Sequence, residues 1–183
     1  MKAIMISIKP KWIAKILNGE KTIEIRKTMP KCDLPIDVYI YCTSHKNYTQ
    51  SLYEVCEEDG GGYDVDYYRP SEEDFILNGK VVAKFTLTQI WTFDKMTILT
   101  EQYNHLFIKK SCLTKEELVN YIGDNVGYAW HIDNLEIFDK PKELSVFTIP
   151  CDFKCPKLGC CYCHKNTRLN KAPQSWCYVE DGL

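Results

Sequence analysis

The stretch GEKTIEIRK, residues 19–27, decides the fold because its apolar and polar side chains alternate. Successive side chains of a β-strand point to opposite faces. Ile23 and Ile25 would therefore face the core, while Glu24 and Arg26 would share the other face. The sequence predicts a short strand that is anchored by one face and presents a charged site on the other.

The segments on either side of this stretch predict a mainly β chain with a few short helices. Pro10 suits the first turn of a helix, and Asn18-Gly19 tolerates the left-handed backbone with which many helices end. The run from Thr114 to Glu117 has the spacing of a capping box, which opens a second helix. Many short strands with scattered helices favour an α+β fold built on a small, closed or half-open barrel. The predicted strands are residues 2–8, 21–27, 36–42, 79–93, 128–138 and 175–179.

Length and composition indicate one ordinary globular domain. The chain has 183 residues, of which 45% are hydrophobic and 26% charged, and we expect residues 1–183 to form a single domain. Lys9, Pro10, Lys11 and Lys15 interrupt the N-terminal apolar segment, which therefore lacks the core of a signal peptide. No apolar run approaches the roughly 18 residues that a membrane span needs. The sequence predicts a cytoplasmic protein without membrane contact.

Charge is distributed in blocks, although the net charge is only −2. Residues 1–31 and 140–171 are basic, and residues 54–74 are strongly acidic. Residues 43–79 contain the acidic block, three consecutive glycines and few periodic apolar positions, so they are expected to form a long acidic insertion loop. Such asymmetry is typical of a polar binding surface, and it is equally compatible with solvated faces that have no partner.

A second insertion is predicted at residues 151–171, where cysteines cluster in CDFKCPKLGCCYCH. Two short-spaced thiol pairs could surround one tetrahedral zinc ion. The alternative is a reduced, basic loop without metal. The predicted ligands are Cys151, Cys155, Cys160 and Cys163, with Cys161 or His164 as substitutes. The other cysteines are scattered and are expected to be isolated thiols.

Residues 19–26 fit the pattern G-x-K-x-x-E-x-R, and this pattern resembles the signature of the ASCH domain family. The order of strands and helices is also similar to that family, and Ser175-Trp176 resembles the ending with which related domains close their cleft. The resemblance implies a PUA-like mixed β-barrel. It also implies a stand-alone member of the kind found in bacteria and their phages.

The resemblance further implies a cleft that binds RNA or modified nucleotides beside residues 19–27. In that role Lys21 would meet a phosphate as a point charge, and Arg26 would supply a planar fork. Glu24 would accept from a base amine or a ribose hydroxyl, or would hold Arg26 in place. The alternative without function is a surface ion pair of Glu24 and Arg26. The candidate nucleic-acid-binding residues are Lys9, Lys21, Glu24, Arg26, Lys27, Ser175 and the possible stacking platforms Trp130 and Trp176.

Two other functions remain open. Compact members of the family are amidohydrolases that deacylate modified cytidine with a lysine, a threonine and a glutamate, so this chain could be a hydrolase of modified nucleosides or RNA. Lys21 matches the lysine, but Glu24 stands where the threonine is expected, and Thr22 lies roughly 6.6 Å along the strand from that place. A protein-interaction module is the third possibility, in which the acidic loop mimics a nucleic-acid backbone or covers the basic cleft.

Overall fold

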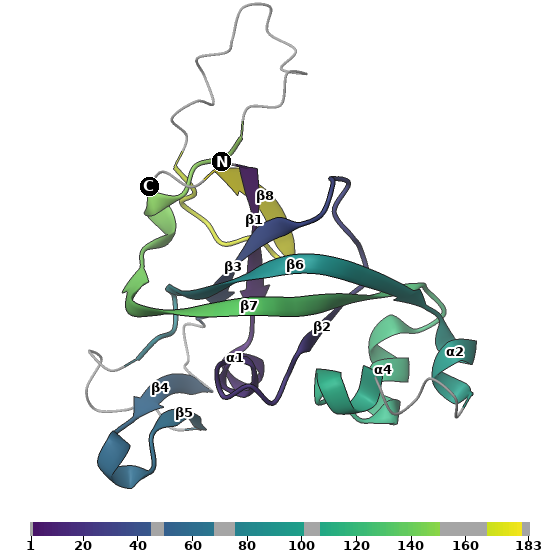
Figure 1. Ribbon diagram of the computed structural model, residues 1–183, viewed down its shortest axis with the longest axis horizontal. Helices are drawn as coiled ribbons and strands as arrows, with labels where there is room; N and C mark the ends of the chain where they lie inside the picture. Colours follow the sequence, from purple (N-terminus) through teal and green to yellow (C-terminus); the bar gives the residue numbers. More distant parts are fainter. Residues whose placement is uncertain (1, 45–49, 68–75, 101–106, 151–167, 181–183) are drawn as a thin grey trace, which may run out of the picture.

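The computed structural model describes residues 2–44, 50–67, 76–100, 107–150 and 168–180. Its main feature is a six-stranded mixed sheet in the order β2-β7-β6-β3-β1-β8 (Figure 1). β1 runs parallel to β3, and every other neighbouring pair is antiparallel. The strands are β1 (Lys2–Ile8), β2 (Ile23–Arg26), β3 (Ile36–Cys42), β6 (Val81–Phe93), β7 (Gly127–Lys142) and β8 (Trp176–Glu180).

The predicted α+β class is confirmed, but the prediction of a barrel is wrong because the sheet does not close. In the part of the chain that the structure describes, β2 pairs with β7 and β8 pairs with β1, and these two edge strands do not pair with each other. β2 is only four residues long, so it offers little backbone for a second ladder. The gap between the two edges is spanned by polar side chains, as described below.

Helix α1 (Pro10–Leu17) positions the start of β2. Proline occupies its first turn as predicted, and Ile13 and Ile16 are buried against the sheet. The helix ends at Asn18, after which Gly19 adopts φ +75°, a conformation that glycine adopts without steric cost. This turn sends the chain directly from α1 into the charged stretch.

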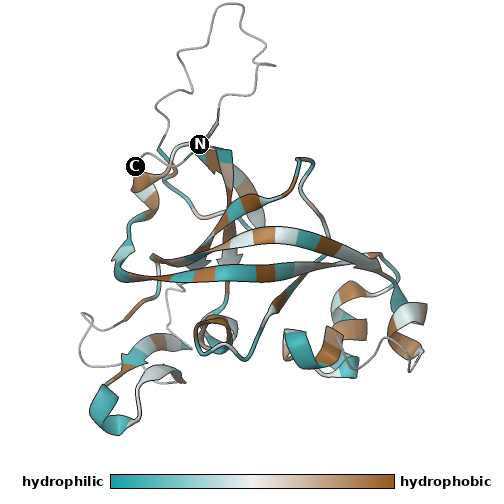
Figure 2. Ribbon diagram, viewed as in Figure 1, coloured by the Kyte–Doolittle hydropathy of each residue, from teal (hydrophilic) through white to brown (hydrophobic). Residues whose placement is uncertain are grey.

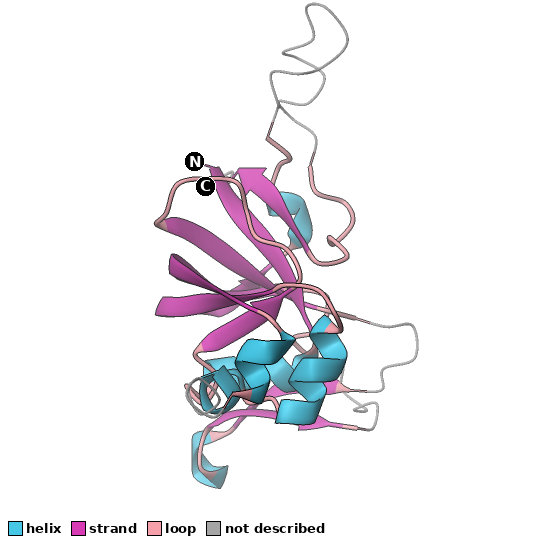
Figure 3. Cartoon of the chain, turned by 90° about the vertical axis from the view of Figure 1, so that its right-hand side faces the viewer, coloured by secondary structure: helices cyan, strands magenta, loops and turns pink. Residues whose placement is uncertain are grey.

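Helix α4 (Lys115–Ile122) covers the apolar face of β2. Thr114 and Glu117 form the predicted capping box. Leu118 and Ile122 pack with Ile23 and Ile25, which are buried as the alternation predicts. Together with the short α2 (Lys95–Leu99), α4 lies below the strands when the molecule is viewed from the side (Figure 3). No helix in the described ranges is long and apolar enough to cross a membrane.

Residues 43–79 were expected to form a long loop, but part of this segment is a β-hairpin. They contain a two-stranded sheet of β4 (Ser51–Val55) and β5 (Gly62–Asp66), joined by the hydrophilic turn η1 (Glu57–Asp59) (Figure 2). Leu52 is fully buried in the main core cluster, with Tyr63 and Val65 packed against that cluster. The apolar positions of the hairpin are few, but α1 supplies the surface that buries them.

Two asparagine side chains fasten this hairpin to the rest of the molecule. Asn18, at the end of α1, donates to the Tyr63 carbonyl at 2.7 Å and accepts from the Tyr63 amide at 2.9 Å. Asn78 accepts from the Leu52 amide at 2.9 Å and donates to the Gln50 carbonyl at 2.8 Å. Each amide group thus replaces a neighbouring strand at one outer edge of the hairpin.

The cysteine cluster lies outside the described residues, as do all the predicted zinc ligands. Just after that segment, Leu169 is buried beside Phe147 and Val179. Its amide donates to the Phe147 carbonyl at 2.7 Å. The described end of the second insertion is therefore anchored to the core.

Candidate functional site

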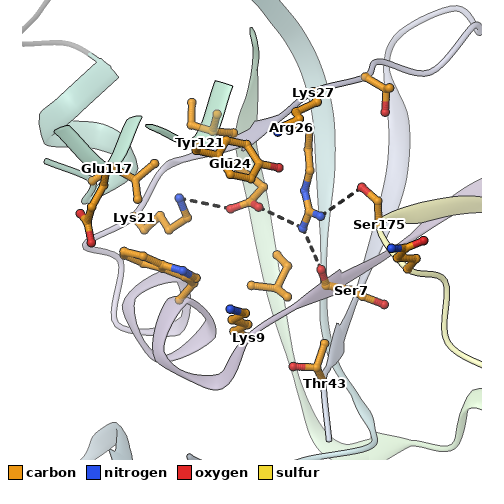
Figure 4. Close-up of a pocket in the computed structure, with 16 residues that line it drawn as sticks. Ser7, Lys9, Lys21, Glu24, Arg26, Lys27, Thr43, Glu117, Tyr121 and Ser175 are labelled. Carbon is orange, nitrogen blue, oxygen red and sulfur yellow. Dashed lines mark hydrogen bonds and ion pairs between the residues drawn. The ribbon is translucent and has the colours of Figure 1, made fainter. Parts of the chain in front are cut away.

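A cavity of about 640 Å³ opens where the sheet fails to close (Figure 4). Its walls come from β2, the end of β1, the start of α1, α4 and the segment before β8. Four basic and two acidic side chains line it, which gives the lining a net charge of +2. The charged residues are Lys9, Lys21, Arg26, Lys27, Glu24 and Glu117.

Three of these side chains form a buried ionic triad with Glu24 at its centre. Lys21 Nζ lies 3.2 Å from Glu24 Oε2, and Arg26 Nη2 lies 3.0 Å from Glu24 Oε1. The three side chains are only 2%, 10% and 9% exposed for Lys21, Glu24 and Arg26. The alternative of a surface ion pair is therefore wrong, because the pair is buried. Two cations around one carboxylate leave the triad with a net positive charge.

Lys21 has no donor left for another group. Besides its contact with Glu24, its ammonium donates to the Ile23 carbonyl at 2.8 Å and to the Ser111 carbonyl at 2.9 Å. An ammonium group has three N–H donors. In this geometry Lys21 orients Glu24 and fastens β2 to the segment before α4, instead of offering a mobile charge to a phosphate.

Arg26 bridges the gap in the sheet. Its Nη2 donates to the Ser7 carbonyl of β1 at 2.8 Å, and its Nη1 donates to Ser175 Oγ, just before β8, at 3.3 Å. Its Nε is buried and has no acceptor among the described residues. The guanidinium group thus connects β2 with β1 and β8, as Figure 4 shows.

The exposed cations of the cavity are Lys9 and Lys27. Both are exposed, and neither has a carboxylate partner within the described ranges. Lys9 is the N-cap residue of α1, whose first turn contains no acidic residue. The partial positive charge of that helix end is therefore not compensated locally. The Lys27 ammonium lies 5.2 Å from the centre of the Tyr121 ring.

The two tryptophans predicted as stacking platforms do not line the cavity. Trp130 is 0% exposed within the core. Trp176 packs against Trp130 and Tyr178, with ring centres 5.8 and 5.5 Å apart, and its Nε1 donates to Thr28 Oγ1 at 2.9 Å. Both rings already have packing partners. Of the predicted closing pair, only Ser175 is part of the cavity wall.

Sequence reasoning missed two aromatic residues that line the cavity, Trp12 and Tyr121. Trp12 shares the helical spacing of its apolar neighbours, so its sequence position did not distinguish it from them. Tyr121 lies four residues after Glu117, so both face the same side of α4, and this spacing was the available signal. Although part of the Tyr121 ring is exposed, burial of the rest raises the pKa of its phenol. The phenol therefore remains a hydrogen-bond donor at neutral pH.

The residues expected in the hydrolase alternative are not arranged as a nucleophile and its activator. Thr22 is not among the residues that line the cavity. Its backbone amide donates to the Lys110 carbonyl at 2.9 Å, and its carbonyl accepts from the Ile132 amide at 3.0 Å. Lys21 is saturated by its own contacts. The described hairpin residues do not line the cavity either, so in this structure the hairpin does not cover the basic cleft.

Among the described residues, no group of three or more histidine, cysteine, aspartate or glutamate side chains is placed to hold a metal ion. The described cysteines Cys32, Cys42, Cys56, Cys112 and Cys177 are free thiols.

Comparison with known proteins gives a match to the ASCH domain over residues 6–142. No curated protein matches the sequence. Crystal structures of ASCH from Zymomonas mobilis are similar in fold. A Tyr-to-Phe mutant has TM-score 0.56 and 17% identity, with 100% of this chain and 93% of that chain covered. A Ser-to-Ala mutant of the same protein has a TM-score of 0.56 and 15% sequence identity. The alignment covers 98% of this chain and 89% of the mutant's chain.

Proposed function

The chain belongs to the ASCH domain family, and we propose that it binds RNA or a nucleotide in the cavity beside β2. The observation that carries the proposal is the gathering of four cationic side chains around one concavity in a protein whose overall charge is negative. Ligand cavities typically measure about 300–1,000 Å³, and this one measures about 640 Å³.

The difference in burial among the charged side chains supports different tasks for the exposed rim and the buried floor of the cavity. Lys9 and Lys27 are exposed at the cavity, so they are the side chains that meet phosphate groups. The triad of Lys21, Glu24 and Arg26 forms a rigid polar floor. Each Glu24 oxygen receives one cationic donor and keeps further acceptor capacity for a base amine or a ribose hydroxyl. The rim supplies electrostatic attraction, and the floor supplies selectivity.

The salt dependence of binding tests this assignment. For a single strand, the logarithm of the association constant falls with the logarithm of the salt concentration with a slope of about −0.7 for each phosphate neutralised. Two rim lysines predict a slope of about −1.4, and Lys9→Ala or Lys27→Ala should each reduce its magnitude by about 0.7. Lys140→Ala, an exposed lysine of β7 outside the cavity, serves as the matched control.

The assay is fluorescence anisotropy with a labelled oligoribonucleotide over a range of salt concentrations. Thermal melting of each variant excludes unfolding as the cause of weaker binding. If Lys9→Ala and Lys27→Ala bind with the same affinity and slope as Lys140→Ala, the cavity is not the binding site and the proposal is wrong.

A further inference from the structure

We infer that the cavity accepts a single unpaired nucleotide whose base stacks on Trp12, with Tyr121 as a second aromatic wall. The inference rests on the proposed function and narrows its ligand from nucleic acid in general to mononucleotides and single strands. It assigns the stacking role to Trp12 and Tyr121 in place of Trp130 and Trp176, which the sequence had suggested.

Lysine ammonium groups lie over both rings, although part of Trp12 also packs against the main core cluster. The ammonium groups of Lys11 and Lys21 lie 4.2 and 5.5 Å from the centre of the Trp12 ring, and that of Lys27 lies 5.2 Å from the centre of the Tyr121 ring. A ring packed face-on into a core has no surface to offer. Trp12 and Tyr121 instead present π faces that hold cations and can hold a base.

The Lys11 ammonium over Trp12 is weakly held, and Lys11 is not among the residues that line the cavity. The Lys11 side chain is 39% exposed, and its contact with Glu117 is long, at 4.0 Å. An exposed pair of this kind contributes little to stability, so moving the Lys11 side chain costs little. Lys21, which lines the cavity, is in contrast held by Glu24 and by the Ile23 carbonyl.

The dimensions and charge of the cavity favour one nucleotide over a duplex. A duplex shows only base edges in its grooves, and its base faces are covered by neighbouring pairs, so two aromatic walls can stack only on an unpaired base. The rim carries just two exposed lysines among the described residues, which suits one or two phosphates. A base held between the aromatic walls would bring its polar edge toward Glu24.

The experiment measures affinity and intrinsic fluorescence for four proteins besides the wild type. Trp12→Leu and Tyr121→Leu remove the rings, Trp12→Phe keeps a stacking surface without indole emission, and Tyr67→Leu changes an exposed aromatic residue outside the cavity. The probes are a single-stranded oligoribonucleotide, a duplex that contains the same sequence, and adenosine monophosphate.

Stacking on one aromatic ring accounts for a roughly 5- to 150-fold loss of affinity when the ring is removed. We expect a loss in this range for the single strand with Trp12→Leu and a smaller loss with Tyr121→Leu. Trp12→Phe and Tyr67→Leu should bind nearly as the wild type does. Nucleotide binding should quench the fluorescence of the wild type, and Trp12→Phe should lose most of this quenching while it keeps its affinity.

The outcomes separate this inference from the proposed function. If Trp12→Leu and Tyr121→Leu bind as tightly as Tyr67→Leu, while Lys9→Ala and Lys27→Ala bind weakly, the proposed function stands and the stacking inference falls. Equal affinity for duplex and single strand also overturns the inference. If none of the probes binds to the wild type, both are wrong.

Discussion

Replacing Lys21 by methionine should destabilise the protein far more than an ordinary surface substitution. Methionine keeps much of the length of the lysine side chain but removes its charge and its three donors. In the wild type these donors serve Glu24, the Ile23 carbonyl and the Ser111 carbonyl, at 3.2, 2.8 and 2.9 Å. The variant would leave Glu24 buried with Arg26 as its single cationic partner.

The size of the effect follows from burial. Removing one partner of a buried ion pair typically costs about 3–5 kcal/mol because the other charge stays desolvated. For a chain of this length, each kcal/mol lowers the melting temperature by roughly 2–4 °C, so Lys21→Met should melt about 6–20 °C below the wild type.

The chain contains a matched control for this experiment. Lys15 and Glu20 form a pair at 2.8 Å, closer than Lys21 and Glu24, but their side chains are 39% and 51% exposed. Hydrogen bonding to Glu20 raises the pKa of Lys15, so Lys15 keeps its charge at neutral pH. An exposed pair contributes about 0.2–1 kcal/mol, so Lys15→Met should lower the melting temperature by at most about 4 °C.

Thermal and urea unfolding of both variants would be monitored by circular dichroism. The double variant Lys21→Met/Glu24→Gln adds a second test. Because it removes both charges of the contact, its loss should be smaller than the sum of the two single losses, by about 0.5–3 kcal/mol. If Lys21→Met melts within the range of Lys15→Met, and the double variant shows additive losses, the triad does not stabilise the fold as argued.

Three further predictions follow from other parts of the chain. Protein purified without chelator should contain about one zinc ion per chain, bound by the predicted thiolates of the 151–171 insertion and released by acid; a metal-free protein that keeps its fold would contradict this. Burial strongly raises the pKa of the Cys42 thiol, so brief alkylation at neutral pH should modify the exposed Cys56 and spare Cys42, as peptide mass mapping would reveal. Hydrogen bonds from Thr97 lower the pKa of Asp94 at the start of α2. The ionised Asp94 therefore stabilises the fold fully above the pKa that it has in the unfolded chain. This stabilisation is lost as the pH falls through the lower pKa of the folded state. The melting temperature of Asp94→Asn should therefore depend less on pH below about pH 4 than that of the wild type. If both proteins show the same dependence of melting temperature on pH, Asp94 does not stabilise the start of α2 as argued.

The strands and helix ends were predictable because they depend on local pattern. The alternation of apolar and polar residues predicted that Ile23 and Ile25 are buried, and the Asn18-Gly19 pair predicted the end of α1. The hairpin of residues 51–66 was not predictable in this way. Its few apolar side chains are buried only because α1 lies against them, and that contact joins segments distant in the sequence.

The sequence pointed to some of the residues that line the cavity, but not to all of them and not to their contacts. The spacing of Glu24 and Arg26 placed them on one face, and the structure brings both to the cavity. The carbonyl of Ser111, which saturates Lys21, is 90 residues away along the chain, so no local pattern could reveal that this lysine is fully bonded. Helical periodicity shows which residues share a side of α1, but it does not show that Trp12 borders a cavity while Ile13 borders the core.

The two asparagines that hold the β4–β5 hairpin also protect it from unwanted association. A two-stranded sheet has two outer edges, and each edge offers unpaired backbone groups on which strands of other molecules can assemble. Asn18 occupies the edge of β5 at Tyr63, and Asn78 occupies the edge of β4 at Leu52. The hairpin therefore extends from the molecule with its edges partly closed and its turn acidic. An alanine in place of Asn18 would free the backbone groups of Tyr63 at the exposed edge of β5, and self-association into strand-paired aggregates is the consequence we expect.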